Sequence, residues 1–122
     1  MIVMPMVESA EGVKNINEIL DVPGLSILMI GPSDLSMHMT GRGFRAWWWP
    51  NNEQPPQVEA AIQTVARACK AKNKICGMAA QTGQGPAADE ARAMKLIRDG
   101  FRLIIQAPLP RQPCVKKAPE CY

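Results

Sequence analysis

The sequence predicts an α/β fold in which helices cover a parallel sheet, and three observations support this prediction. Short apolar runs alternate along the chain with longer segments whose apolar residues recur at helical spacing. The apolar runs are nearly continuous, as is typical of strands buried on both faces of a parallel sheet. The chain has 122 residues, of which 47% are hydrophobic and 20% charged, and this composition suits one folded domain.

The first part of the chain contains two predicted strands joined by a helix. The first strand is the apolar run at residues 2–7. Ser9 is a suitable N-cap for the helix that follows, because its hydroxyl can accept a hydrogen bond from a first-turn amide. Apolar residues at helical spacing continue to Leu20, and a Pro-Gly pair then ends the helix. Residues 25–30 form the second predicted strand.

The remainder of the chain repeats this alternation after a long loop, which we expect at residues 31–54. The elements that we expect after the loop are a helix opened by Pro55-Pro56, a strand at 75–80, a helix from Pro86 to Gly100 and a strand at 101–105. The first of these helices has an apolar stripe that extends to Cys69. Four parallel strands with crossover helices are therefore predicted.

Four strands and three helices amount to half of a (β/α)₈ barrel, which typically needs about 250 residues. We therefore expect residues 1–107 to form a partial TIM barrel. Residues 108–122 contain four prolines and no periodicity, which indicates a disordered tail. A half barrel has two open sheet edges, so we expect it to pair with a second copy or with a complementing chain.

Composition argues against several classes of function. The formal net charge is only +3 and no basic stripe is present, so we do not expect nucleic-acid binding. No apolar stretch approaches the length of about 20 residues that a membrane span needs, and without a secretory signal a cytoplasmic location is expected. No Cys-x-x-Cys pair suggests a zinc or iron–sulfur site. Cys69 and Cys76 lie in apolar segments, where we expect buried, reduced thiols.

Two carboxylates follow the first two predicted strands. Glu8 ends the first strand, and Asp34 lies just beyond the second, after a corner formed by Gly31 and Pro32. Ligands of parallel α/β folds bind beyond the carboxyl ends of the strands, and neighbouring strands lie about 4.8 Å apart. Both carboxylates could therefore bind one cation, and oxygen ligands suit Mg²⁺ or Mn²⁺. Alternatively, Glu8 caps a helix and Asp34 makes an Asx turn.

Three motifs resemble the HpcH/HpaI aldolase/citrate lyase family, whose members are metal-dependent pyruvate aldolases with a TIM-barrel fold. They are Pro-Met-Val-Glu-Ser at 5–9, Ile-Leu-Asp-Val-Pro-Gly at 19–24 and Ile-Gly-Pro-Ser-Asp-Leu-Ser at 30–36. The resemblance covers residues 3–105 and implies strands five to eight of the barrel. It also implies that Glu8 and Asp34 bind the divalent metal, which would be Mg²⁺, Mn²⁺ or Co²⁺.

The chemistry that this resemblance implies agrees with the local sequence. Aldol chemistry on pyruvate passes through an enolate, whose negative charge a divalent ion stabilises. After Pro32, which cannot donate, the backbone amides of Ser33 and Asp34 can receive the pyruvate carboxylate. Gly31 leaves space for close approach of the substrate. The expected function is a carbon–carbon lyase acting on a 2-keto acid and an aldehyde.

Two alternatives stay open. One is a citrate lyase β-like enzyme that acts on acyl-CoA esters, and the other is an inactive, partner-binding remnant of an aldolase. The catalytic His and Arg of the family belong to barrel strands one to four, so we assign no catalytic residue and expect a truncated chain. His38 is the only histidine, and we expect it to be an exposed loop residue.

Two further segments each allow two interpretations. The three tryptophans at 47–49 are either an exposed patch for a subunit contact or substrate lid, or are partly buried against the open barrel face. The Gly-Gln-Gly-Pro sequence at 83–86 either approaches a phosphate at a helix N-terminus or serves only as a flexible loop, the latter being favoured.

Overall fold

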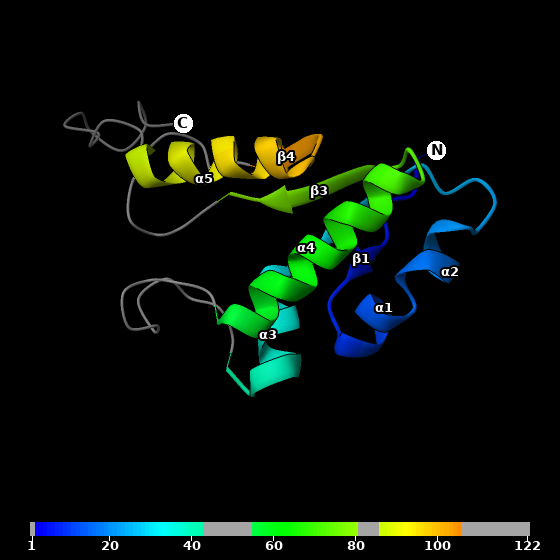
Figure 1. Cartoon of the computed structure of the whole chain (residues 1–122), viewed down its shortest axis with the longest axis horizontal. Coiled ribbons are helices and arrows are strands. Elements are labelled where there is room, and N and C mark those ends of the chain that lie inside the picture. The colour runs from blue at the N-terminus through cyan, green and yellow to red at the C-terminus, as the bar shows by residue number, and fades with distance from the viewer. Residues whose placement is uncertain (1, 43–54, 81–85, 106–122) are drawn as a thin grey trace, which may run out of the picture.

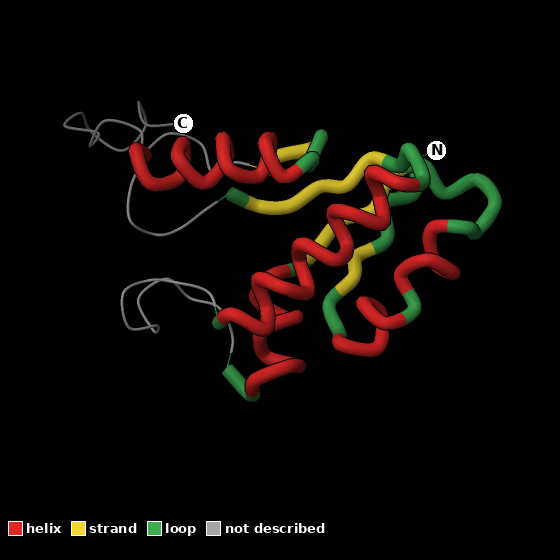
Figure 2. The backbone as a smooth tube through the Cα atoms, in the orientation of Figure 1, coloured by secondary structure: helices red, strands yellow, loops and turns green. Residues whose placement is uncertain are grey.

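Four parallel strands form one sheet in a computed structural model that describes residues 2–42, 55–80 and 86–105. The strands are β1 (Met6–Val7), β2 (Ile27–Ile30), β3 (Ile75–Ala79) and β4 (Leu103–Ile105). They lie in the order β1-β2-β3-β4, and each neighbouring pair is parallel. Helical segments connect the strands along the chain (Figure 2). The predicted α/β fold with a parallel sheet is therefore confirmed, whereas the partial barrel stays a prediction.

Five helices are present in the described residues. They are α1 (Ala10–Lys14), α2 (Ile16–Leu20), α3 (Pro32–Thr40), α4 (Pro56–Ala71) and α5 (Pro86–Asp99). Ser9 is the N-cap of α1, as predicted, and its Oγ accepts a hydrogen bond of 3.0 Å from the Gly12 amide. The single helix that we expected after it is divided into α1 and α2 at Asn15. No helix within these described segments is both long and apolar enough to cross a membrane.

The prediction of a long loop after Ile30 is wrong over the first part of that segment, because Pro32–Thr40 form helix α3. Pro32 occupies the first turn, where its missing N–H costs nothing, and its fixed φ favours the helix. Gly41 ends α3 in the left-handed conformation, at φ 71°, and its amide donates to the Met37 carbonyl. His38 therefore lies on a helix and not in a loop, although its side chain is exposed as expected. Residues 43–54, including the three tryptophans, lie outside the described residues.

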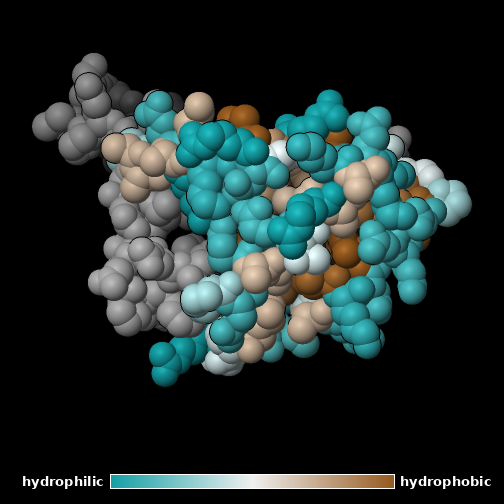
Figure 3. Space-filling model, in the orientation of Figure 1, coloured by the Kyte–Doolittle hydropathy of each residue, from teal (hydrophilic) through white to brown (hydrophobic). Residues whose placement is uncertain are grey.

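Alternate residues of each strand contribute to the hydrophobic core. Val7, Leu28, Ile30, Cys76 and Met78 are buried in one cluster with apolar side chains of the helices. Helix α4 lies across the strands in Figure 1 and buries its whole predicted stripe, Val58, Ala61, Ile62, Val65, Ala66 and Cys69. Hydrophilic residues predominate on the outward face over these helices, with hydrophobic residues visible between them (Figure 3). The core thus lies between the sheet and α4.

The other face of the sheet carries the strand residues that alternate with those of the core. Met6 and Ile105, on the two edge strands, are 53% and 49% exposed. Between them Met29 is buried, and its sulfur lies where a side chain at Gly77 would project. Glycine at position 77 therefore leaves the space that the methionine sulfur occupies. This face is the one that would line the interior of the predicted barrel.

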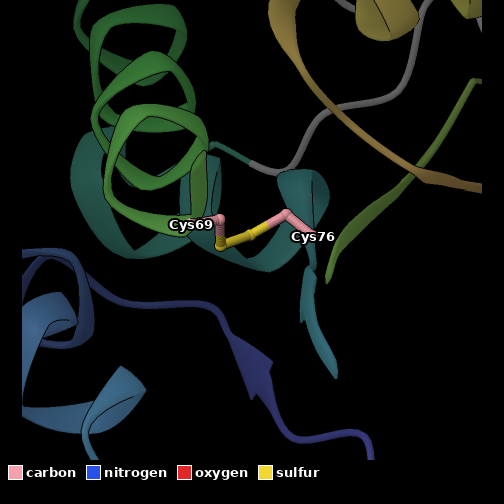
Figure 4. The surroundings of a disulfide bond; sticks show 2 residues. All are labelled: Cys69 and Cys76. Carbon is pink, nitrogen blue, oxygen red and sulfur yellow. A yellow bond between two sulfur atoms is a disulfide. The ribbon is translucent and has the colours of Figure 1, made fainter. Parts of the chain in front are cut away.

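Cys69 and Cys76 form a disulfide bond between the end of α4 and β3 (Figure 4). Both cysteines are buried, as expected, but the prediction of reduced thiols is wrong. Packing of α4 on the sheet places the two Cα atoms 6.0 Å apart, a separation that a disulfide spans. Sequence spacing could not show this proximity, because it depends on how the chain turns between helix and strand. Cys114 and Cys121 lie outside the described residues.

A network of charged side chains joins α4 to α5. Lys95 donates to Glu59 at 2.6 Å and to Asp99 at 2.7 Å, and Gln63 donates to the same two carboxylates. Burial acts to raise the pKa of Glu59, but the hydrogen bonds from Lys95 and Gln63 and the charges of Lys95 and Arg92 outweigh it and lower that pKa. Hydrogen bonds and nearby cations likewise outweigh burial at Asp99 and lower its pKa. The network is therefore most favourable when both carboxyls are ionised.

We expect Glu59→Gln to lower the free energy of unfolding by about 0.5–1 kcal/mol at neutral pH, a modest value because the network is partly exposed. Since the folded-state pKa of Glu59 is depressed, its contribution is present above the ordinary carboxyl pKa and is lost as the pH falls through the folded value. Urea unfolding between about pH 7 and pH 3 measures this. The variant should lose less stability on acidification than the parent, whereas Glu18→Gln, at an exposed carboxylate of α2, should behave like the parent.

Reduction of the Cys69–Cys76 bond should lower the free energy of unfolding by about 2–3 kcal/mol, because the bond closes a short loop in the unfolded chain. Unfolding in urea with and without dithiothreitol measures the difference, in a background that carries Cys114→Ser and Cys121→Ser. A matched Cys69→Ala/Cys76→Ala variant should not respond to the reductant. Equal stability of the oxidised and reduced parent would contradict this stabilising role.

Candidate functional site

Pairing of β1 with β2 places Glu8 beside Gly31. Val7 and Ile30 are the last paired residues of the two strands, and the Gly31 amide donates to the Val7 carbonyl at 3.3 Å. A Cβ atom at position 31 would lie 2.8 Å from both Cγ and Cδ of Glu8, so the carboxylate lies directly against the Gly31 backbone. Any residue other than glycine would displace it. The first predicted carboxylate and the Gly-Pro corner therefore meet at the carboxyl end of the sheet.

The same corner forms the N-terminus of α3. Gly31 is the N-cap, with φ −92° and ψ 90°, and its carbonyl accepts the helical hydrogen bond from the Leu35 amide at 2.9 Å. The amides of Ser33 and Asp34 precede this bond, so they lie at the N-terminal rim of the helix. Asp34 is exposed in the first turn, where the positive end of the helix dipole favours a carboxylate. Glu8 thus lies against the N-cap residue of α3, and Asp34 lies in the first turn of the same helix.

His38 contributes a contact near this corner that the sequence analysis missed. The Ala10 amide donates to His38 Nδ1 at 3.5 Å, which joins the start of α1 to α3. His38 lies four residues after Asp34, so the two side chains share a face of α3. This spacing would have placed His38 beside Asp34 already in the sequence analysis if the segment had been predicted as a helix.

The donor set suits a hard divalent cation. Within the described segments no group of three or more His, Cys, Asp and Glu side chains could hold a metal. If the half-buried Glu8 and the exposed Asp34 bound one cation, they would leave positions for water and substrate oxygens. Mg²⁺ and Mn²⁺ are commonly bound in this way. Glu8 is not the cap of α1, because Ser9 has that role. The alternative role of Glu8 as a helix cap is therefore wrong, whereas an Asx turn at Asp34 stays a prediction.

The chain has a parallel α/β sheet with polar groups beyond the carboxyl ends of its strands. Parallel α/β proteins as a class bind their ligands at that end of the sheet. The family model of HpcH/HpaI aldolase/citrate lyase matches residues 1–104. The chain therefore belongs to this family, as its motifs predicted.

Curated relatives are similar over part of the chain. A 4-hydroxy-2-oxo-heptane-1,7-dioate aldolase of Klebsiella pneumoniae is 37% identical over 78 residues, which are 64% of this chain and 26% of the relative. A 2-keto-3-deoxy-L-rhamnonate aldolase of Escherichia coli O1:K1 is 36% identical over 74 residues, covering 61% of this chain and 25% of the relative. The matched segment thus spans about a quarter of these relatives' length.

Solved structures share the arrangement of strands and helices. An HpcH/HpaI aldolase/citrate lyase family protein of Burkholderia cenocepacia J2315 superimposes with a TM-score of 0.68 at 30% identity, over 88% of this chain and 36% of that protein. A citrate lyase of Burkholderia xenovorans LB400 gives a TM-score of 0.70 at 19% identity, over 88% of this chain and 35% of that protein. The second likeness establishes the fold alone.

We expect Gly31→Ala to displace the Glu8 carboxylate while leaving the fold intact. The atoms that a Cβ would meet are at the end of a flexible side chain, so the free energy of unfolding should fall by less than about 1 kcal/mol. Gly77→Ala should cost more, about 1–3 kcal/mol, because its Cβ would be caught between Met29 and the Leu103 Cβ. Chemical denaturation compares the two variants, and carboxyl ¹³C shifts report on Glu8. An unchanged Glu8 environment in Gly31→Ala would contradict the contact.

Proposed function

We propose that this chain provides the metal- and substrate-binding part of an aldolase that cleaves or forms a carbon–carbon bond of a 2-keto acid such as pyruvate, with an aldehyde as the other substrate. The observation that carries the proposal is the position of Glu8 against Gly31, at the helix N-terminus that also bears Asp34. Both curated relatives described above are named as aldolases, of a 2-oxo acid and of a 2-keto acid. Membership of the family supports the same class of reaction.

In this proposal Glu8 and Asp34 would hold a divalent cation, Mg²⁺ or Mn²⁺, with Co²⁺ as a further candidate. When bound, such an ion stabilises negative charge that develops on the keto oxygen of the substrate. Glu8 is half-buried, and its carboxylate lies against the backbone of Gly31. Asp34 is exposed on the first turn of α3, where it can reach a shared ligand.

The corner at 31–34 would bind the carboxylate of the substrate. Pro32 has no N–H, and the amides of Ser33 and Asp34 follow it at the N-terminal rim of α3. Amides at such a rim, aided by the helix dipole, favour an anion. The absence of a side chain at Gly31 leaves the space that the Glu8 carboxylate occupies. The four residues Gly31, Pro32, Ser33 and Asp34 therefore form the proposed substrate-binding segment.

Groups that transfer the proton are left unassigned, because the chain spans only about a quarter of its curated relatives. We infer that a second copy or a complementing chain completes the site, on the face of the sheet where Met6 and Ile105 are half exposed. The partial TIM barrel, pairing through that face and the cytoplasmic location belong to this proposal.

A second candidate is an inactive remnant that binds metal without turnover. An acyl-CoA lyase of the citrate lyase β type is a third candidate.

Calorimetric titration of the full chain with Mn²⁺, in the presence and absence of pyruvate, tests the proposed site. We expect pyruvate to strengthen Mn²⁺ binding, and Glu8→Gln and Asp34→Asn each to weaken it by about tenfold or more, which is about 1.4 kcal/mol. Glu11→Gln, at an exposed carboxylate of α1, should leave binding unchanged. A folded chain that binds no Mn²⁺, or binds it equally in all variants, would refute the site.

Pyruvate release from a 4-hydroxy-2-oxo acid then separates the candidates. Turnover that requires Mn²⁺ and is lost in Glu8→Gln supports the aldolase. Mn²⁺ binding at Glu8 and Asp34 without turnover supports the remnant.

A further inference from the structure

A second concave site lies at the opposite end of the sheet from Glu8 and Asp34. Its cavity has a volume of about 370 Å³, and its walls include Lys70, Asn73, Lys74, Ile97, Gly100 and Arg102. Lys74 directly precedes β3, and Arg102 directly precedes β4. The cavity therefore lies at the amino ends of these strands, beside the C-terminal ends of α4 and α5, which run in the same direction across Figure 1.

Three cationic residues and no acidic residue line this cavity. Lys74 donates from its ammonium group to the Leu25 carbonyl, so its charge is held in place. Across the part of the chain that the structure describes, no ion pair involves Lys70 or Arg102. By contrast, the nearby cation Lys72 pairs with Asp21. The cavity thus concentrates positive charge that the described acidic side chains leave uncompensated.

Left-handed residues at the ends of both helices bring the cationic residues together. Asn73 has φ 51° and Gly100 has φ 103°, and each turns the chain from a helix toward the following strand. The stem of Lys70 passes near Gly100, since a Cβ at position 100 would lie 4.0 Å from the lysine Cδ. The two helix ends and their basic residues therefore border one space.

These cations are not needed to cap the two helices. At the end of α4 the Lys74 amide donates to the Cys69 carbonyl at 2.9 Å, and the Asn73 amide donates to Lys70. At the end of α5 the Phe101 amide donates to the Leu96 carbonyl at 3.0 Å, and the Gly100 amide donates to Ile97. Backbone amides thus satisfy two of the terminal carbonyls of each helix, in the pattern of a Schellman motif. Each helix end carries only about half a negative charge. The three full positive charges of the cavity exceed the combined negative charge of the two helix ends.

From this geometry we infer that the cavity is an anion site that binds the phosphate group of a small molecule. Phosphate carries close to two negative charges near neutral pH, and Lys and Arg side chains are its usual partners in proteins. The cavity volume lies within the range of small-molecule sites, about 300–1,000 Å³. The exposed side chain of Ile97 provides an apolar wall for the remainder of a phosphate ester. This site is independent of the proposed metal site.

Titration of the ¹⁵N-labelled full chain with inorganic phosphate and with phenyl phosphate at low ionic strength tests the inference. We expect saturable shifts of the amides of Lys70, Asn73, Gly100 and Arg102 with both probes. Tighter binding of phenyl phosphate would identify a phosphate ester as the ligand class, and equal affinity would identify phosphate itself. No saturable shift at these amides in the folded chain would overturn the inference.

A charge-matched pair of variants separates the cavity from general electrostatics. Lys70→Gln/Arg102→Gln removes two positive charges from the cavity, and we expect the dissociation constant for phosphate to rise at least about tenfold. Lys14→Gln/Arg67→Gln removes two exposed charges elsewhere, and the constant should change by less than about twofold, as general screening requires. An equal loss of affinity in the two variants would overturn the inference. Circular dichroism and thermal unfolding confirm that both variants are folded.

Discussion

Parallel pairing of β1 with β2 is the constraint on which the candidate site depends. The pairing is short, since β1 contains only Met6 and Val7, yet it fixes the register that brings Glu8 against Gly31. Because side chains alternate between the faces of a strand, a slip of one residue would turn Glu8 toward the helices and Val7 away from the core. Burial of Val7 therefore holds the register, and the register positions the carboxylate.

Helix α4 stabilises this arrangement from the other side of the core. Its apolar stripe packs on the sheet, its C-terminal end is tied to β3 by the Cys69–Cys76 disulfide, and Glu59 and Gln63 join it to α5. None of these attachments involves Glu8 or the corner at 31–34. The strand ends can then carry polar and exposed groups, because other residues supply the stability of the fold.

The two ends of the sheet differ in charge as a consequence of chain direction. In a parallel sheet all carboxyl ends lie together, and here they carry Glu8 and, one turn into α3, Asp34. The amino ends of the strands lie at the opposite end of the sheet. Helices α4 and α5 end there, and Lys70, Lys74 and Arg102 lie beside their ends. The proposed cation site and the proposed anion site therefore lie at opposite ends of the sheet. Two of the three motifs that carry the family resemblance, at residues 5–9 and 30–36, lie at the first of these ends.

The sequence by itself determined the alternation of strands and helices, the apolar stripe of α4, the Ser9 cap and the family, because these depend on local periodicity, capping chemistry and short motifs. It also pointed to Glu8 and Asp34, since both follow apolar runs whose ends share an edge in a parallel sheet. Helix α3 was missed although Pro32 and Gly41 mark its ends, because its apolar pattern is weak. Only the tertiary structure decided the contact of Glu8 with Gly31, the disulfide, the His38 contact and the basic cavity. Each of these joins residues from different elements, and such proximity is set by strand register and by the angle at which helices pack.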